Sequence, residues 1–174
     1  MNAGIVLVAF LPALLVAAAV FDLTSFTIPN IVPGSMLTLF AILLVVLALS
    51  GHPLSLADTG LHLAAGMVGL LAGAALFALR QVGGGDAKLF AGAALWMGWD
   101  ALFDYAILAT LLGGCLTIFL VAIRHVPLPA ILAEQPWLVR LIERKRDVPY
   151  GVALAIAALT LLPNTELFRL AATS

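Results

Sequence analysis

The sequence predicts an all-α integral membrane protein with six transmembrane helices, of which the fourth is short. Hydrophobic residues make up 64% of the 174 residues, charged residues only 10%, and the mean hydropathy is +1.18. An ordinary globular chain carries about 25% charged residues, so this composition cannot cover a surface that faces water. It excludes a soluble domain, a disordered tail and a fibrous repeat. Eight basic and nine acidic side chains offer no nucleic-acid footprint, so no nucleic-acid partner is expected.

The helices follow from the lengths of the apolar runs. About 20 apolar residues are needed to cross roughly 30 Å of hydrocarbon. One membrane domain over residues 1–174 is predicted, with helices at about residues 3–21, 31–50, 61–79, 87–99, 105–123 and 150–170. The run 87–99 is too short to cross the hydrocarbon, so we expect one of its ends to lie below the headgroups. The last helix is expected to continue past Pro163 with a kink.

Local signals support individual helices. The run 3–21 has neither the basic start nor the cleavage site of a signal peptide, so we expect it to be mature structure. Asn30 is a fair N-cap for the second helix. Small residues at every fourth position of the third helix predict close backbone packing; they are Ala65, Gly69 and Gly73.

The placement of Lys and Arg predicts the orientation, because cytoplasmic loops retain positive charge. Seven of the eight basic residues fall in the loops 80–88 and 124–149, and Arg169 is the eighth. These loops and the loop 22–30 are therefore predicted to be cytoplasmic, with both termini outside. Within the loop 124–149, Trp137, Leu141 and Arg140 have the spacing of an amphipathic helix that lies on membrane lipids.

Two aspartates stand out because ionisable groups at the membrane are costly and mark candidate functional sites. Asp22 ends the first apolar run, and Asp86 opens the short fourth helix directly after Gly83-Gly84-Gly85. Both are predicted at the cytoplasmic ends of their helices. Paired carboxylates can activate water, since one keeps a proton while the other accepts one. An interfacial helix end remains an alternative explanation for Asp22 alone.

Two sequence elements carry a family resemblance. The stretch from Asp22 to Asn30, DLTSFTIPN, together with GGGDAK at residues 83–88, resembles the type IV prepilin peptidases, which are membrane aspartic proteases of the GxGD class. The likeness extends to LWMG at residues 95–98 and VPYG at residues 148–151. Asp22 and Asp86 match the two catalytic aspartates of that family. Supporting roles are expected for five neighbours, which are Gly83, Gly85, Lys88, Pro29 and Asn30. For Lys88, snorkelling to the cytoplasmic headgroups is an equal alternative.

The resemblance implies an enzyme that removes the short basic leader from prepilins at the cytoplasmic face of the cell inner membrane, without a metal or a cofactor. Larger relatives carry a cytoplasmic insertion with paired cysteine motifs and methylate the new N-terminus. This chain has the single cysteine Cys115 and no such insertion, so no methyltransferase activity is expected. The short form is most similar to the peptidases of tight-adherence (Flp) pilus systems.

The helix positions suggest how the aspartates divide the work. Asp86 lies at a helix N-terminus, where the helix dipole favours negative charge, so it is the expected general base. Asp22 lies at a helix C-terminus and is the expected acid. Two alternatives stay open. A non-catalytic scaffold or transporter subunit of a secretion or pilus system also suits short helices with a buried carboxylate. A Mg²⁺-dependent lipid-modifying enzyme normally needs more clustered carboxylates.

Overall fold

The computed structural model describes residues 3–124, 134–143 and 148–173, which are helical apart from short connections and contain no strand. The longest helices are α1 (Ala3–Ser25), α2 (Ile31–Leu49), α3 (Leu56–Ala78) and α4 (Gly84–Ile123). All four are long and apolar enough to cross a membrane. Shorter helices follow at α6 (Pro136–Glu143), α7 (Tyr150–Leu161), η1 (Leu162–Asn164) and α8 (Glu166–Thr173). The predicted all-α, multi-pass membrane class is confirmed.

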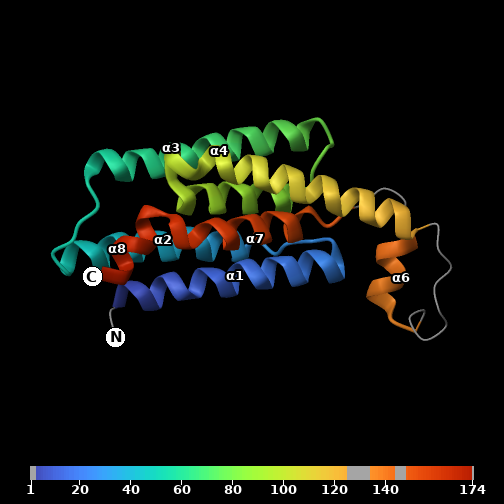
Figure 1. Cartoon of the computed structure of the whole chain (residues 1–174), viewed down its shortest axis with the longest axis horizontal. Coiled ribbons are helices and arrows are strands. Elements are labelled where there is room, and N and C mark those ends of the chain that lie inside the picture. The colour runs from blue at the N-terminus through green and yellow to red at the C-terminus, as the bar shows by residue number, and fades with distance from the viewer. Residues whose placement is uncertain (1–2, 125–133, 144–147, 174) are drawn as a thin grey trace.

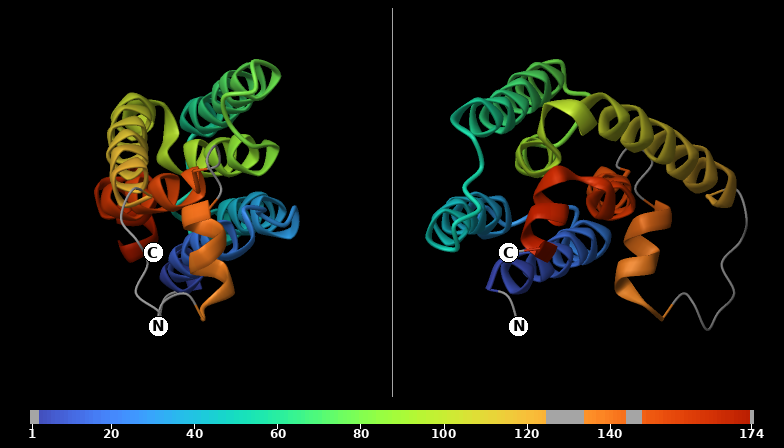
Figure 2. Two further views of the ribbon diagram at one scale, coloured as in Figure 1. Left: turned by 90° about the vertical axis from the view of Figure 1, so that its right-hand side faces the viewer. Right: turned by 60° about the vertical axis from the view of Figure 1, so that its left-hand side comes forward.

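The long helices run side by side and alternate in direction along the long axis of the molecule (Figure 1). The linker after α1, the loop before α4 and helix α6 gather at one end, which we call the α6 end. Both ends of the chain lie at the opposite, terminal end. Helix α6 lies across the bundle rather than along it (Figure 2). The described parts of the three loops predicted to share one side of the membrane therefore lie at one end of the bundle.

Helix α4 consists of two segments that meet at Gly98. Gly98 has φ +73° and ψ 179°, which breaks the helix into residues 84–97 and 99–123. The chain reverses there, and the two segments run in opposite directions (Figure 1). The short fourth helix of the sequence analysis is thus present, but the predicted loop at 100–104 is wrong, since those residues are helical. A single glycine at positive φ makes the turn, so no loop is needed.

The His62 side chain completes this turn. Its Nδ1 lies 2.8 Å from the carbonyl oxygen of Leu95, near the end of the first segment of α4. A Cβ at Gly98 would lie 2.7 Å from Cε1 of the same ring. The imidazole therefore supplies a partner for a helix-end carbonyl, which otherwise has none inside the helix.

Two helix boundaries differ from the predicted ones. Helix α1 extends to Ser25 rather than 21, and the Ser25 hydroxyl donates to the carbonyl of Phe21 at 2.7 Å. Helix α3 begins at Leu56 rather than 61, because Ser55 caps it by accepting a 3.0 Å hydrogen bond from the N–H of Asp58. Ser55 thus bonds a free backbone N–H at the start of α3, and Ser25 bonds a backbone carbonyl in the last turn of α1.

The predicted continuous helix 150–170 is wrong. Helix α7 ends at Leu161, a 3-10 turn spans Leu162–Asn164, and Thr165 is extended before α8 begins. Pro163 occupies the start of the 3-10 turn, where its missing N–H costs nothing. The Thr165 hydroxyl accepts a 3.3 Å hydrogen bond from the N–H of Phe168 and so caps α8. A proline followed by a capping residue ends one helix and starts another.

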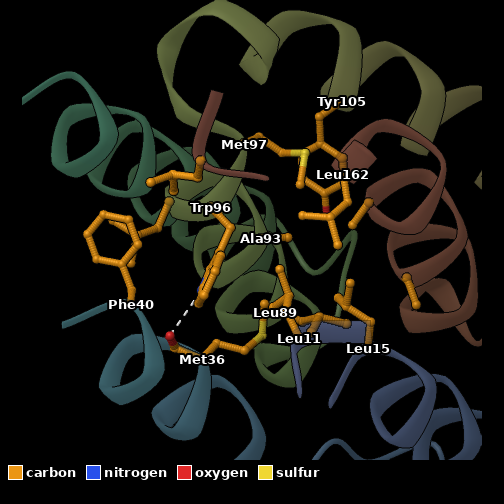
Figure 3. Close-up of a cluster of buried hydrophobic side chains, with 14 of the residues drawn as sticks. Leu11, Leu15, Met36, Phe40, Leu89, Ala93, Trp96, Met97, Tyr105 and Leu162 are labelled. Atoms are coloured by element: carbon orange, nitrogen blue, oxygen red, sulfur yellow. Dashed lines mark hydrogen bonds between the residues drawn. The ribbon is translucent and has the colours of Figure 1, made fainter. Parts of the chain in front are cut away.

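The first segment of α4 lies at the centre of the packing. A Cβ at Gly69 of α3 would lie 2.9 Å from Cβ of Ala94, and one at Gly73 would lie 2.9 Å from Cα of Ala87. The predicted close packing of the small residues of α3 is therefore confirmed. On its other faces this segment packs on α1 and α2 (Figure 3). The turn at Gly98 is buried, as irregular backbone at membrane depth must be.

Candidate active site

The two aspartates singled out in the sequence lie together at the α6 end. Asp22 is in the last turn of α1 and 4% exposed, and Asp86 is in the first turn of α4 and 9% exposed. Both line one cavity of about 660 Å³, which we call the aspartate cavity. Its other lining residues are Phe26, Phe77, Ala78, Arg80, Gln81, Val82, Gly83, Val148 and Tyr150. The fold thus brings together two carboxylates that are 64 residues apart in sequence (86 − 22).

Gly151 holds Asp22 in place. The backbone N–H of Gly151 donates a 2.6 Å hydrogen bond to Oδ2 of Asp22. Gly151 lies in the first turn of α7, where backbone N–H groups have no partner inside the helix. A Cβ at this position would lie 2.8 Å from Oδ2 of Asp22 and 2.8 Å from Cδ1 of Ile28. Only glycine lets the helix approach the carboxylate this closely.

Asp86 is anchored by the glycine run that precedes it. The N–H of Gly83 donates a 3.1 Å hydrogen bond to Oδ2 of Asp86, which closes a capping interaction at the start of α4. Asp22 and Asp86 are thus held by different backbone N–H groups and line the same cavity. Oδ1 of Asp86 is buried and has no hydrogen-bond partner among the described residues. A buried carboxylate oxygen without a partner is costly, so it is a natural contact for a bound water or peptide.

The predicted supporting glycines act on the backbone around this pair. Gly83 lines the cavity and supplies the N–H for Asp86. A Cβ at Gly85 would lie 3.1 Å from Cβ of Ile28 and 3.2 Å from its backbone nitrogen. Gly85 therefore lets the linker after α1 press against the start of α4. Ile28 contacts both Gly85 and Gly151, so it fills the space between the backbones that hold the two aspartates.

Of the other predicted supporting residues, Lys88 and Asn30 bond to each other, and Pro29 bonds to the start of α2. Nζ of Lys88 donates a 2.8 Å hydrogen bond to Oδ1 of Asn30, and both side chains are exposed. The carbonyl of Pro29 accepts a 3.0 Å hydrogen bond from the N–H of Val32 at the start of α2. None of the three is among the described residues that line the aspartate cavity. They fix the linker that leads from Asp22 to α2.

Two contributors were not assigned from the sequence. Gly151 and Tyr150 belong to the VPYG stretch, which carried part of the resemblance without a role. The sequence feature that could have identified them is a glycine one residue after the start of a helix that follows Pro149. A free backbone N–H at that position can bond an anion. Outside the undescribed stretches, no group of three or more His, Cys, Asp or Glu side chains is placed to hold a metal ion.

A comparison with known families agrees with this geometry. The model of the type IV leader peptidase family matches residues 9–118, which is well over half of the chain and includes both Asp22 and Asp86. No curated protein and no solved structure matches the chain. The match covers the helices that carry both carboxylates, from α1 to the second segment of α4. The match supports the prepilin peptidase assignment made from the sequence. The chain therefore belongs to the type IV leader peptidase family and is a membrane peptidase.

Proposed function

We propose that the chain is an aspartic endopeptidase that removes the short basic leader from Flp-type prepilins, with Asp22 and Asp86 activating the attacking water. The observation that carries this proposal is the pair of buried carboxylates on different helices, which face one cavity and are each held by a backbone N–H. Paired carboxylates of this kind hydrolyse peptide bonds without a metal ion. Burial in a shaped cavity strengthens their action on the peptide carbonyl.

The positions of the two carboxylates suit different catalytic roles, with Asp86 as the general base and Asp22 as the general acid. Asp86 takes a proton from water through its free Oδ1 while the water oxygen attacks the scissile carbonyl carbon. Asp22 gives a proton to the carbonyl oxygen, which forms a tetrahedral diol. As the diol collapses and the C–N bond breaks, Asp86 gives its proton to the leaving amine, and Asp22 takes a proton from one diol hydroxyl, which restores the carbonyl. Asp86 suits the basic role because it lies at a helix N-terminus, where negative charge is favoured.

The orientation of the site follows from charge. Arg80, Lys88, Arg124 and Arg140 lie in the segments at or next to the α6 end, whereas Arg169 lies in α8 at the terminal end. Because positive charge is retained on the cytoplasmic side, we place the aspartate cavity at the cytoplasmic face of the inner membrane and both termini outside. Counting both segments of α4 and α7, the chain then crosses six times. No methyltransferase activity is assigned to it.

The test is co-expression with an Flp-type prepilin, with leader removal followed by gel shift. We expect wild type to cleave and both Asp22→Ala and Asp86→Ala to be inactive at equal membrane levels. Asp100→Ala is the matched control, because Asp100 is an exposed aspartate at the terminal end, and it should cleave like wild type. Cleavage by either cavity variant would refute the dyad. An inactive wild type would favour the scaffold or transporter alternative.

A further inference from the structure

A second cavity adjoins the aspartate cavity at membrane depth. It has a volume of about 470 Å³ and lies between α3, both segments of α4 and α7. We call it the small-residue groove. Its lining residues are Ala72, Gly73, Leu76, Gln81, Val82, Asp86, Ala87, Phe90, Ala106, Ala109, Thr110, Gly114, Tyr150 and Leu154. Figure 2 shows α3 and the second segment of α4 on either side of the first segment, which forms the floor between them.

The groove and the aspartate cavity are continuous. Four residues line both of them, and these are Gln81, Val82, Asp86 and Tyr150. The polar members of the groove gather at this junction, apart from Thr110, and the rest of the lining is apolar. Asp86 is nine-tenths buried at the junction and keeps its unpartnered Oδ1. A chain that lay in both cavities would pass directly over this carboxylate.

The walls of the groove suit a helix more than a loop. Glycine and alanine dominate both sides, with Ala72 and Gly73 on α3 and Ala106, Ala109 and Gly114 on the second segment of α4. Small residues let a helix backbone come close to its neighbours, which is how helices associate where lipid offers no hydrophobic drive. Tyr150 stands at the junction, with its ring 3.0 Å from the position of a Cβ on Gly113.

We propose that the small-residue groove binds the apolar helix that follows the cleavage site in the substrate, so that the scissile bond lies at the junction beside Asp86. This inference rests on the proposed peptidase function and extends it to how the substrate is held. The substrate changes from polar to apolar where the lining does. Its polar, extended leader lies in the aspartate cavity, and its apolar helix lies in the groove. Tyr150 then separates the two parts of the substrate.

Gly114 offers a way to fill the groove without disturbing the fold. A Cβ on Gly114 meets nothing within 4 Å among the described residues, so the Gly114→Leu side chain has room to enter the groove. Gly34 of α2 is the matched control, since it is an exposed helical glycine that also meets nothing within 4 Å and lies outside the groove. Both variants are assayed at equal membrane levels.

Two substrates separate the possible causes. One is the whole prepilin, and the other is a short peptide that spans the cleavage site but lacks the apolar helix. We expect Gly114→Leu to lower kcat/KM for the whole prepilin about tenfold or more and to leave cleavage of the short peptide unchanged. Gly34→Leu should match wild type on both. Equal loss on both substrates, or no loss on the whole prepilin, would overturn the proposal and leave lipid as the occupant.

Photo-crosslinking provides a readout that does not depend on turnover. A crosslinking amino acid is placed at Thr110, inside the groove, or at Leu111, which is 62% exposed on the same helix and outside it. The Asp22→Ala background keeps the prepilin uncut. We expect crosslinks from Thr110 and none from Leu111, and equal crosslinking from both would refute the groove. If wild type cleaves neither substrate, the peptidase function itself fails and this proposal falls with it.

Discussion

The N–H of Gly151 bonds to Oδ2 of Asp22 at 2.6 Å, across 129 residues of sequence. This contact joins the end of α1 to the start of α7. The start of α7 therefore sets where the Asp22 carboxylate lies, although it contributes no acidic side chain of its own.

Gly151→Ala should cut leader cleavage strongly. The added Cβ would lie 2.8 Å from Oδ2 of Asp22 and 2.8 Å from Cδ1 of Ile28, so α7 must shift away from the carboxylate. We expect a loss of about 1–3 kcal/mol in unfolding free energy from overpacking and a fall of about a hundredfold in kcat/KM from misplacing the site. Thermal unfolding in detergent and the gel-shift assay measure the two effects.

The control for this change is Gly60→Ala. Gly60 is an exposed residue of α3 where a Cβ meets nothing within 4 Å in the described part of the chain. Alanine is the better helix former by about 1 kcal/mol, so this variant should keep its activity and gain slightly in stability. Wild-type activity in Gly151→Ala would show that the contact between α7 and Asp22 does not position the site.

The Lys88–Asn30 hydrogen bond should matter little for cleavage. Both side chains are exposed and neither lines the described part of the aspartate cavity. Water competes for both partners of an exposed hydrogen bond, which leaves a net contribution of about 1 kcal/mol, so Lys88→Met and Asn30→Ala should each change kcat/KM by less than about fivefold. The double variant should cost no more than the larger single change. A loss as deep as that of Asp86→Ala would give Lys88 a direct role in substrate binding.

The sequence predicted the long apolar runs, a short fourth helix and the two aspartates, because each has a local signal: a long uncharged run, a run too short to cross the hydrocarbon, a carboxylate at a helix end. It did not predict the loop-free turn at Gly98 or the break before Thr165. Those depend on a positive φ and on a side-chain cap, which composition does not reveal. The role of Gly151 was missed because its partner is 129 residues away.

Gly98→Ala should destabilise the protein more than an equivalent change at another glycine with positive φ. Gly98 has φ +73°, and a Cβ there would lie 2.7 Å from Cε1 of His62. Gly51 has φ +80° with nothing within 4 Å in the described structure. Gly51→Ala should therefore cost only the backbone penalty of about 1–2 kcal/mol, and Gly98→Ala should cost clearly more. Equal melting temperatures for the two variants would show that the His62 ring moves away from the added Cβ at no cost in stability.

Trp96 gives a test of the buried core around the short segment of α4. Its Nε1 donates a 3.0 Å hydrogen bond to the carbonyl of Met36, and its ring packs edge-on against Phe40 (Figure 3). Trp96→Phe removes this hydrogen bond and leaves space beside Phe40, so we expect a loss of about 1–3 kcal/mol in unfolding free energy. Trp99→Phe is the control, because Trp99 is 48% exposed three residues along the chain. If both variants unfold at the same temperature, the bond from Trp96 to α2 does not hold the segment that carries Asp86.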